Sequence, residues 1–454
     1  MMTEGAMSAP PTDLNALEPD IWSSTAQRVG GAVQVGGVEL RDLAREHGTP
    51  VYVLDEDDFR GRARAHRTAF DGFDVYYAGK AFLSTTVARW LAEDGLSLDV
   101  CSFGELTIAR RAGFPAERLA FHGNNKSTEE LAAALDDGVG KIVLDSFVEI
   151  DRLAKLAADR GVRPNVLVRA SVGVEAHTHE FIATAHEDQK FGFAVATGEV
   201  LEAVRRVLAS APLNLVGLHS HIGSQIFDTA AFELAAHRLV RLATRVRDQH
   251  DVQIAELGLG GGLGIAYVPS DDPPETGEFA AALRTIVAEE CEANGLPVPR
   301  LSVEPGRAIA GPAMCTVYEV GTVKPVRVGS AGVRTYVSVD GGMSDNIRTA
   351  LYGAEHSCAL VNRASDSPAV LVRVVGKHCE SGDIVVREVY LPGDVAPGDL
   401  IAVPATGAYC RAMASNYNQV PKPPVVAVRQ GATELVLRRE TMDDLLRLDA
   451  GLSS

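Results

Sequence analysis

A lysine stands at the end of the apolar run 74–80, DVYYAGK, which has the composition of a buried strand. A buried ammonium group is costly unless it finds a partner or reaches water. Lys80 therefore allows two interpretations. Either its side chain extends to solvent where the strand ends, or its amine forms a Schiff base with a carbonyl compound. The other reactive residues must decide between them.

A glycine run, GLGGGLG, occupies residues 258–264. Adjacent glycines let backbone amides approach an anion closely, although the same run also suits a tight turn at a strand end. It is not a Walker loop, because no Lys-Ser or Lys-Thr pair follows it. The phosphate-binding candidates are Gly260, Gly261 and Gly262, with Ser224 as a further hydrogen-bond donor.

Glu304, in SVEPGRAI, is either the partner of Arg307 in a structural ion pair or a carboxylate that keeps a ring nitrogen protonated. His219 and His221 form a His-x-His pair. Alternation along a strand predicts that they face opposite ways, and the sequence shows no third ligand, so we expect a ring stacked on a cofactor rather than a metal site. A second histidine group, expected in a solvated loop, comprises His177, His179 and His186.

From residue 74 the chain alternates short apolar strands with amphipathic helical stretches, several of which end in glycine. Nearly every strand ends in reactive side chains or glycines, and the active sites of (β/α)8 barrels lie at that end of the strands. We therefore predict a (β/α)8 TIM-like barrel over residues 66–315 rather than a doubly wound sheet. The eight expected strands are 74–80, 97–102, 119–123, 141–146, 165–170, 215–221, 256–262 and 301–307.

After residue 315 the chain becomes rich in β-branched residues separated by turn residues. This composition predicts a C-terminal, mostly antiparallel β domain over residues 316–454. The strand-like segment 23–65 is expected to join that domain, and residues 1–22 to form a flexible tail.

The chain has 454 residues and a net charge of −17, which disfavours nucleic acid and anionic membrane surfaces as partners. Its six cysteines form no Cys-x-x-Cys pair, so a disulfide scaffold or zinc site is not expected and a cytoplasmic location fits. The start lacks the features of a signal peptide, and no apolar run approaches the roughly 18 residues that span a bilayer.

A lysine, a phosphate cradle, a carboxylate and a stacking histidine at one barrel end together describe a site for pyridoxal 5'-phosphate. The chain also resembles the fold-type III pyridoxal-phosphate decarboxylases, and within them the diaminopimelate decarboxylases, from about residue 20 to 440. The resemblance implies an alanine-racemase-like barrel, a homodimer, and decarboxylation of meso-2,6-diaminopimelate to L-lysine, the last step of lysine biosynthesis. The motifs that carry it are YAGKAF, DVCSFGEL, HSHIGSQ, LGLGGGLGI, EPGRAI, VDGGMSDNIRTALYGA, CESGDI and GAYCRAMASNYN.

The resemblance also implies roles for single residues. Lys80 would hold the cofactor, His221 would stack on its ring, and Glu304 would contact the pyridine nitrogen. Cys379 and Glu380 would come from the partner subunit, with Cys379 as the candidate acid that protonates the carbanion left by loss of carbon dioxide. The other implied cofactor contacts are Asp99, Ser224, Gly260, Gly261, Gly262, Pro305, Gly306, Arg307 and Tyr409. The implied substrate contacts are Arg307, Arg348, Tyr352, Glu380 and Tyr409.

Three alternatives stay open. A decarboxylase of the same fold could act on ornithine, arginine or carboxynorspermidine, but Arg348 with Glu380 argues against simple diamino acids, whose distal group is an ammonium alone. An amino-acid racemase fits the CESGD and NIRTALYGA motifs poorly. A catalytically inactive binding protein is disfavoured because Lys80, Glu304 and Cys379 are all present.

Overall fold

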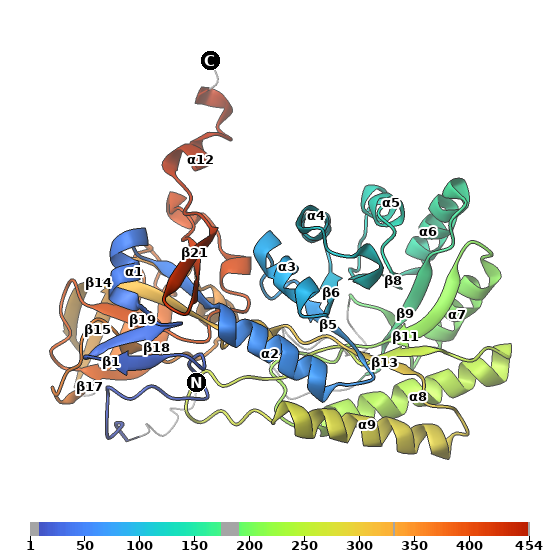
Figure 1. Cartoon of the computed structure of the whole chain (residues 1–454), viewed down its shortest axis with the longest axis horizontal. Coiled ribbons are helices and arrows are strands. Elements are labelled where there is room, and N and C mark those ends of the chain that lie inside the picture. Colours follow the sequence, from blue (N-terminus) through green and yellow to red (C-terminus); the bar gives the residue numbers. More distant parts are fainter. Residues whose placement is uncertain (1–8, 174–189, 330–331, 453–454) are drawn as a thin grey trace. The chain divides into compact units, whose positions relative to one another are not determined.

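The computed structural model describes residues 9–173, 190–329 and 332–452 (Figure 1). The chain divides into two compact units. One comprises residues 1–59, 266–271 and 311–454, and the other comprises residues 60–265 and 272–310. The histidines expected in a loop at 177–186 lie outside the described residues.

The unit of residues 60–265 and 272–310 is a closed barrel of eight parallel strands, which confirms the predicted (β/α)8 fold. The last strand pairs with the first, and a short strand, β10 (Phe193–Ala194), adds to the ring beside β9. Seven of the eight strands end two to four residues earlier than predicted, and β9 ends one residue later, so most of the expected reactive residues stand in the loops just beyond the strands. In order around the ring the strands are β5 (Asp74–Ala78), β6 (Ser97–Val100), β7 (Leu119–Phe121), β8 (Lys141–Leu144), β9 (Asn165–Ser171), β11 (Asn214–His219), β12 (Glu256–Gly258) and β13 (Arg300–Val303).

Four consecutive barrel helices begin at a serine that follows a strand. In each case the serine Oγ accepts a backbone N–H of the first turn, which stabilises the helix start by about 1 kcal/mol relative to alanine. Because each cap fixes where a helix begins, it also fixes the length of the loop that precedes it. The capped helices are α3 (Thr85–Glu93) after Ser84, α4 (Phe103–Ala112) after Ser102, α5 (Thr128–Asp136) after Ser127 and α6 (Phe147–Arg160) after Ser146.

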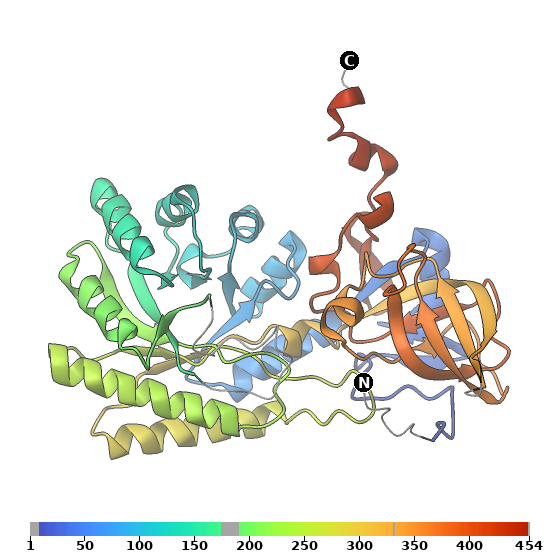
Figure 2. The same ribbon diagram turned by 180° about the vertical axis from the view of Figure 1, so that it is seen from behind.

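The long helices α8 (Ala230–His250) and α9 (Thr276–Ala293) run side by side in both views (Figures 1 and 2). Phe232 packs edge-on against Phe279 between them, with ring centroids 4.8 Å apart. No helix in the described ranges is long and apolar enough to cross a membrane. The remaining helices are α1 (Leu40–His47), α2 (Glu56–Ala69), α7 (Glu199–Ala209), α10 (Arg307–Ala310), α11 (Arg348–Tyr352) and α12 (Met442–Leu446), with 3-10 turns at 116–118, 411–413, 417–419 and 450–452.

The other unit is built on a mixed sheet. Two of its pairings are parallel, β15–β17 and β4–β20, and the others are antiparallel. Its core is rich in valine, as the β-branched sequence predicts. The strand order is β18 (Ile384–Pro392), β17 (Ala369–Val375), β15 (Val333–Val339), β14 (Met314–Arg327), β4 (Val51–Asp55), β20 (Val425–Arg429) and β21 (Ala432–Leu437), with β19 (Leu400–Val403) beside β14 and β16 (Ala359–Leu360) beside β19.

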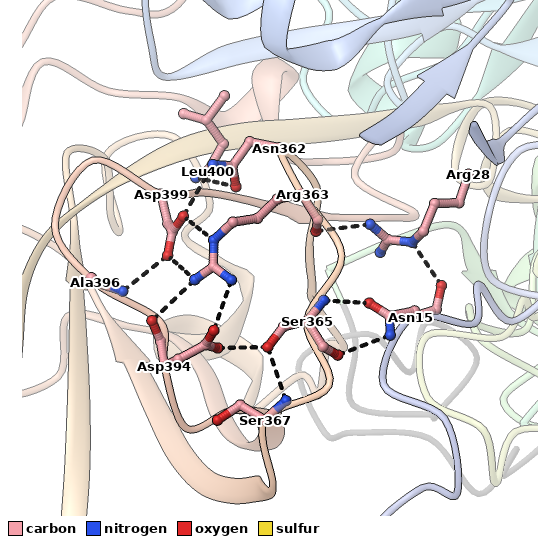
Figure 3. A network of polar contacts seen from close by, with 10 residues as sticks. All are labelled: Asn15, Arg28, Asn362, Arg363, Ser365, Ser367, Asp394, Ala396, Asp399 and Leu400. Atoms are coloured by element: carbon pink, nitrogen blue, oxygen red, sulfur yellow. Dashed lines mark hydrogen bonds and ion pairs between the residues drawn. The ribbon is translucent and has the colours of Figure 1, made fainter. Parts of the chain in front are cut away.

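Residues near the N-terminus are bound into this unit through a polar network (Figure 3). The Asn15 side chain donates to the Ser365 carbonyl at 2.9 Å and accepts the Ser365 N–H at 3.0 Å, while Arg28 Nε donates to the Asn15 carbonyl at 2.9 Å. Ile21 and Trp22 are buried. These contacts correct the expectation of a flexible tail for residues 15–22. A small antiparallel sheet of β1 (Gln27–Val29), β2 (Ala32–Val35) and β3 (Val38–Glu39) follows.

Candidate active site

A buried carboxylate lies between two histidines at the carboxyl ends of the barrel strands. His219, the last residue of β11, places Nε2 at 2.9 Å from Glu304 Oε1, just after β13. His122, just after β7, places Nε2 at 3.4 Å from the same oxygen. Burial works against ionisation of Glu304, but the imidazoles outweigh it and hold the pKa of this carboxyl well below its usual range. Glu304 is therefore a carboxylate.

The two imidazoles approach the same oxygen of Glu304, and that of His122 is neutral. Burial lowers the pKa of His122 well below its ordinary value, although Glu304 opposes the shift. The Nδ1 atom of His219 is buried and has no hydrogen-bond partner within the described ranges, so we assign the proton to Nε2, which faces Glu304. The N–H that His219 directs at Glu304 Oε1 stabilises the negative charge of that oxygen.

The sequence expectation for the His-x-His pair needs correction. We expected opposite faces of one strand, but β11 ends at His219, so alternation does not extend to His221. His221 instead accepts the Gly261 N–H at Nδ1, at 3.2 Å. Burial, and then the positive charges of Lys80 and Arg169, lower the pKa of His221 well below its usual value, so its ring is neutral. A flat ring of this kind is suited to stacking on an aromatic cofactor.

The sequence showed no third ligand beside His219, whereas the fold supplies His122. The ligand atoms of His122, His219 and Glu304 lie within 4.8 Å of one another, which makes the cluster a possible metal site by residue type. The neighbouring groups favour a ring nitrogen instead. Lys80 and Arg169 add positive charge close to the same residues, which a dication would not tolerate well.

A second carboxyl completes this group. Asp99, in β6, is buried, and its Oδ1 lies 3.7 Å from His122 Nε2. Burial and the charge of Glu304 raise the pKa of Asp99 well above its usual value. Two neighbouring carboxyls rarely both ionise, so Asp99 takes the proton and Glu304 keeps the charge. Arg169, near the end of β9, is buried and lies 3.6 Å from Asp145.

Lys80 lies two residues beyond the end of β5, and its side chain is exposed. The Gly79 N–H donates to the Asp99 carbonyl at 2.9 Å, which ties the lysine's loop to the neighbouring strand. The Lys80 charge lowers the pKa values of Asp99 and His221, so its ammonium lies within their electrostatic reach. Lys80 is therefore exposed, as the interpretation in which its side chain extends to solvent predicts. This exposure is also compatible with the Schiff-base interpretation, because an aldehyde can reach an exposed lysine.

The glycine run packs too tightly for any side chain. A Cβ at Gly261 would lie 2.1 Å from the Glu304 carbonyl oxygen, and one at Gly262 would lie 2.5 Å from the Gly223 carbonyl oxygen. Beside this run, Arg307 donates to Ser224 Oγ from Nη2 at 2.9 Å and from Nε at 3.2 Å. A guanidinium, a hydroxyl and glycine backbone at one corner form a donor set that suits a phosphate.

In the other unit, Arg348 at the start of α11 is buried with its guanidinium over the ring of Tyr267, 4.4 Å from the centroid. Its Nε and Nη1 atoms have no hydrogen-bond partner among the residues the structure describes. A buried donor without an acceptor costs about 1–3 kcal/mol. Such a guanidinium is suited to an anionic ligand that would supply the missing acceptors.

Cys379 and Glu380 are exposed on the loop between β17 and β18. The residue before them, His378, is buried, and its N–H donates to Asp383 Oδ2 at 2.8 Å. Glu380 Oε1 accepts the Tyr417 hydroxyl at 2.7 Å. Buried residues therefore hold the base of the loop while its thiol and carboxylate face outward.

Two tyrosines of the predicted site belong to the same unit. Tyr409, after β19, has φ of 63°, a left-handed conformation that is uncommon outside glycine and collects at functional sites. Tyr352, at the end of α11, points its hydroxyl at the Met413 sulfur, 4.0 Å away.

The structure thus collects the predicted barrel residues at one end of the barrel and the others in the second unit. It also adds three residues that the sequence did not single out as site residues: His122 and Arg169, which lie at the ends of barrel strands, and Tyr267 in the other unit. No local signal marks Tyr267, because its significance comes from Arg348, which is distant in the chain.

Comparisons with known proteins agree with this chemistry. A family model described as pyridoxal-dependent decarboxylase, pyridoxal binding domain, matches residues 56–311. The diaminopimelate decarboxylase of Mycobacterium tuberculosis is 59% identical over 443 residues, which cover 96% of this chain and 99% of that protein. The Bacillus subtilis enzyme of the same name is 45% identical, covering 94% and 98%. The crystal structure of diaminopimelate decarboxylase from M. jannaschii in complex with L-lysine matches with a TM-score of 0.87 at 30% identity, covering 94% of this chain and 98% of that one.

Proposed function

The chain belongs to the pyridoxal-dependent decarboxylases and, within them, to the diaminopimelate decarboxylases, and on this premise we propose how its residues perform the reaction. The reaction converts meso-2,6-diaminopimelate to L-lysine and carbon dioxide, the last step of lysine biosynthesis, with pyridoxal 5'-phosphate as cofactor. The resemblance found in the sequence is confirmed by these relatives.

The barrel residues fit the cofactor. Ser224 and Arg307 beside the glycine run would hold the phosphate, Lys80 would hold the aldehyde carbon through its amine, and Glu304 would hold the ring nitrogen. When bound, the cofactor supplies a protonated pyridine ring that accepts the electrons left behind by carbon dioxide.

Glu304 has the central electrostatic role among the protein's own groups. A carboxylate beside the ring nitrogen keeps the proton on that nitrogen, and the N–H of His219 keeps the carboxylate ionised and oriented. Asp99, whose pKa is raised, adds little negative charge to compete with it. Cys379 would supply the proton that replaces the lost carboxylate.

The observation that carries the substrate assignment is the buried guanidinium of Arg348, two of whose nitrogens have no hydrogen-bond partner in the described part of the chain. Diaminopimelate has an ammonium and a carboxylate on its non-reacting carbon. Arg348 would bind that carboxylate and Glu380 that ammonium, with Tyr352 and Tyr409 as further contacts. Ornithine carries only an ammonium there, so it would leave the guanidinium without an acceptor.

A substrate panel tests the assignment. The purified protein with pyridoxal phosphate is given meso-diaminopimelate, ornithine, arginine or carboxynorspermidine, and carbon dioxide and the amine product are quantified. We expect lysine and carbon dioxide in equal amounts from diaminopimelate. Preference for ornithine or arginine would refute the Arg348 argument, and exchange of the α-proton without carbon dioxide would indicate a racemase.

We also infer a homodimer in which Cys379 and Glu380 serve the site of the partner subunit, and a cytoplasmic location. The exposure of both residues on a loop with a fixed base supports the first inference. Six free thiols fit a reducing compartment.

Subunit exchange tests the shared site. Lys80→Ala and Cys379→Ala should each be inactive. In a mixed dimer one site collects both defects and the other collects neither, so random pairing should restore about a quarter of wild-type activity, given a closed two-fold dimer. If activity stays at the level of the single variants, each site is built within one chain.

A further inference from the structure

Arg348 lies over the ring of Tyr267, with its Cζ atom 4.4 Å from the ring centroid, and has no carboxylate partner among the described residues. Arg169 also lies over a ring, that of Phe191, but Asp145 lies beside it. Arg363 is held by Asp399 and Asp394. A carboxylate partner would occupy N–H donors and neutralise the charge, whereas a ring face attracts the cation and leaves the in-plane donors available.

The ring itself is held in place. Tyr267 packs edge-on against His356, with centroids 5.1 Å apart and planes at 84°. The Tyr267 N–H donates to Asp271 Oδ2 at 2.8 Å, which closes a tight turn under the tyrosine. Tyr267 and His356 are both buried, so neither ring turns freely in solvent. The surface on which Arg348 lies is therefore rigid.

Hydrogen bonds and close contacts of His356 and Asn346 also hold the backbone of Arg348. His356 Nε2 lies 3.3 Å from Asn346 Nδ2, and Asn346 Oδ1 accepts the Arg348 N–H at 3.3 Å. Contacts thus connect Tyr267 to His356, His356 to Asn346 and Asn346 to the Arg348 backbone, and the Arg348 guanidinium lies on the ring of Tyr267. Side chain and backbone of the arginine are both fixed, which removes much of the entropy cost of binding an anion.

We propose that Tyr267 is a positioning residue for substrate selectivity: its ring fixes the plane of the Arg348 guanidinium so that its unpartnered N–H donors can reach the carboxylate on the non-reacting carbon of the substrate. The inference rests on the proposed function. Because this carboxylate is retained in lysine and absent from cadaverine, Tyr267 matters for lysine and diaminopimelate and not for a plain diamine.

Two ligands and three variants test this assignment in the holoenzyme. L-Lysine and cadaverine differ only in that carboxylate, and each is measured as a competitive inhibitor. Tyr267→Leu removes the ring, Tyr267→Phe keeps it, and pentafluorophenylalanine at position 267 keeps its shape while withdrawing the negative charge of its face. Thermal unfolding is recorded for each variant.

For Tyr267→Leu we expect the lysine inhibition constant and the KM for diaminopimelate to rise roughly three- to thirty-fold, the range of a desolvated cation–π contact, with kcat little changed. Cadaverine inhibition should stay at the wild-type value. Tyr267→Phe should behave as wild type, and the fluorinated variant should weaken lysine alone even if Tyr267→Leu does not fold.

Lysine inhibition that is unchanged in the fluorinated and leucine variants would overturn the proposal, as would equal weakening of lysine and cadaverine. Arg348→Lys, measured in parallel, separates this failure from that of the proposed function. If Arg348→Lys also leaves lysine inhibition unchanged, the substrate role of Arg348 falls together with that of Tyr267. If only the Tyr267 variants have no effect, the role of Arg348 stands.

Discussion

His219 Nε2 lies 2.9 Å from Glu304 Oε1, and both side chains are buried. The contact joins the end of β11 to the loop after β13, at the barrel end where the predicted cofactor residues collect. It holds the carboxylate in its ionised state and in one orientation. If His219 acts on the reaction through Glu304, the effects of changing the two residues on kcat should not be independent.

Glu304→Gln should keep the fold and the cofactor but lose most of kcat, because an amide cannot keep the ring nitrogen protonated. His219→Ala should lower kcat as well, by a smaller factor. If His219 acts through Glu304, the double variant should be no slower than Glu304→Gln alone. Steady-state kcat for the four proteins checks this, and rate losses that simply multiply would show that His219 acts independently.

Ser224→Ala should weaken the binding of pyridoxal 5'-phosphate, because the Oγ that Arg307 contacts is removed from the proposed phosphate corner. A hydrogen bond to a charged group is worth roughly 1.5–3 kcal/mol, so the dissociation constant should rise by about tenfold or more. Absorbance titration of the apoprotein measures it. Pyridoxal, which lacks the phosphate, is the control ligand, and an equal loss of affinity for pyridoxal would place Ser224 elsewhere.

Arg348→Lys should raise the KM for diaminopimelate by about tenfold or more, because lysine cannot reproduce the fixed N–H donors of a guanidinium. Arg373→Lys is the matched control, since Arg373 lies on β17 of the same unit and its Nη2 is 3.7 Å from Glu388. Steady-state kinetics should show little change for the control. Similar KM values for both variants would remove Arg348 from substrate binding.

The stability of the barrel unit should fall as the pH drops below 6.5, partly because of His66 in α2. Its Nδ1 donates to the Arg62 carbonyl at 2.9 Å, and Nε2 is buried with no acceptor in the described part of the chain. Burial therefore lowers the pKa of His66 from 6.5 to about 4. The unfolded chain binds this proton first, so stability is lost between pH 6.5 and about 4, by about 2 kcal/mol at pH 5 relative to pH 8.

Urea unfolding of wild type and His66→Phe at pH 8 and pH 5 checks this prediction. The difference in unfolding free energy between the two pH values should be smaller in His66→Phe by about the same amount. Comparing the proteins at each pH cancels the contributions of His122 and His221. An unchanged difference would mean that His66 does not carry the effect.

The architecture could be predicted from the sequence, because the signals that specify it are local. A strand of apolar residues, a capping serine and an amphipathic helix recur four times from β5 to α6, and each part can be recognised within about ten residues. The motifs around Lys80, Glu304 and Cys379 are equally local, so the reaction class could also be predicted. Seven of the eight strand ends were placed too late, because the residues that follow these strands were read as part of them although they do not pair with a neighbouring strand.

Which side chains meet could not be predicted, because the contacts join segments that are distant in the chain. Closure of β13 onto β5 brings the ends of all eight strands to one edge, so His122 and His219 reach Glu304 from two other strands. The pairing of Tyr267 with Arg348 arises in the same way, from a segment of residues 266–271 that packs with the β unit although the barrel flanks it on both sides in the chain. Such contacts depend on register and packing between distant segments, and no pattern within either segment encodes them.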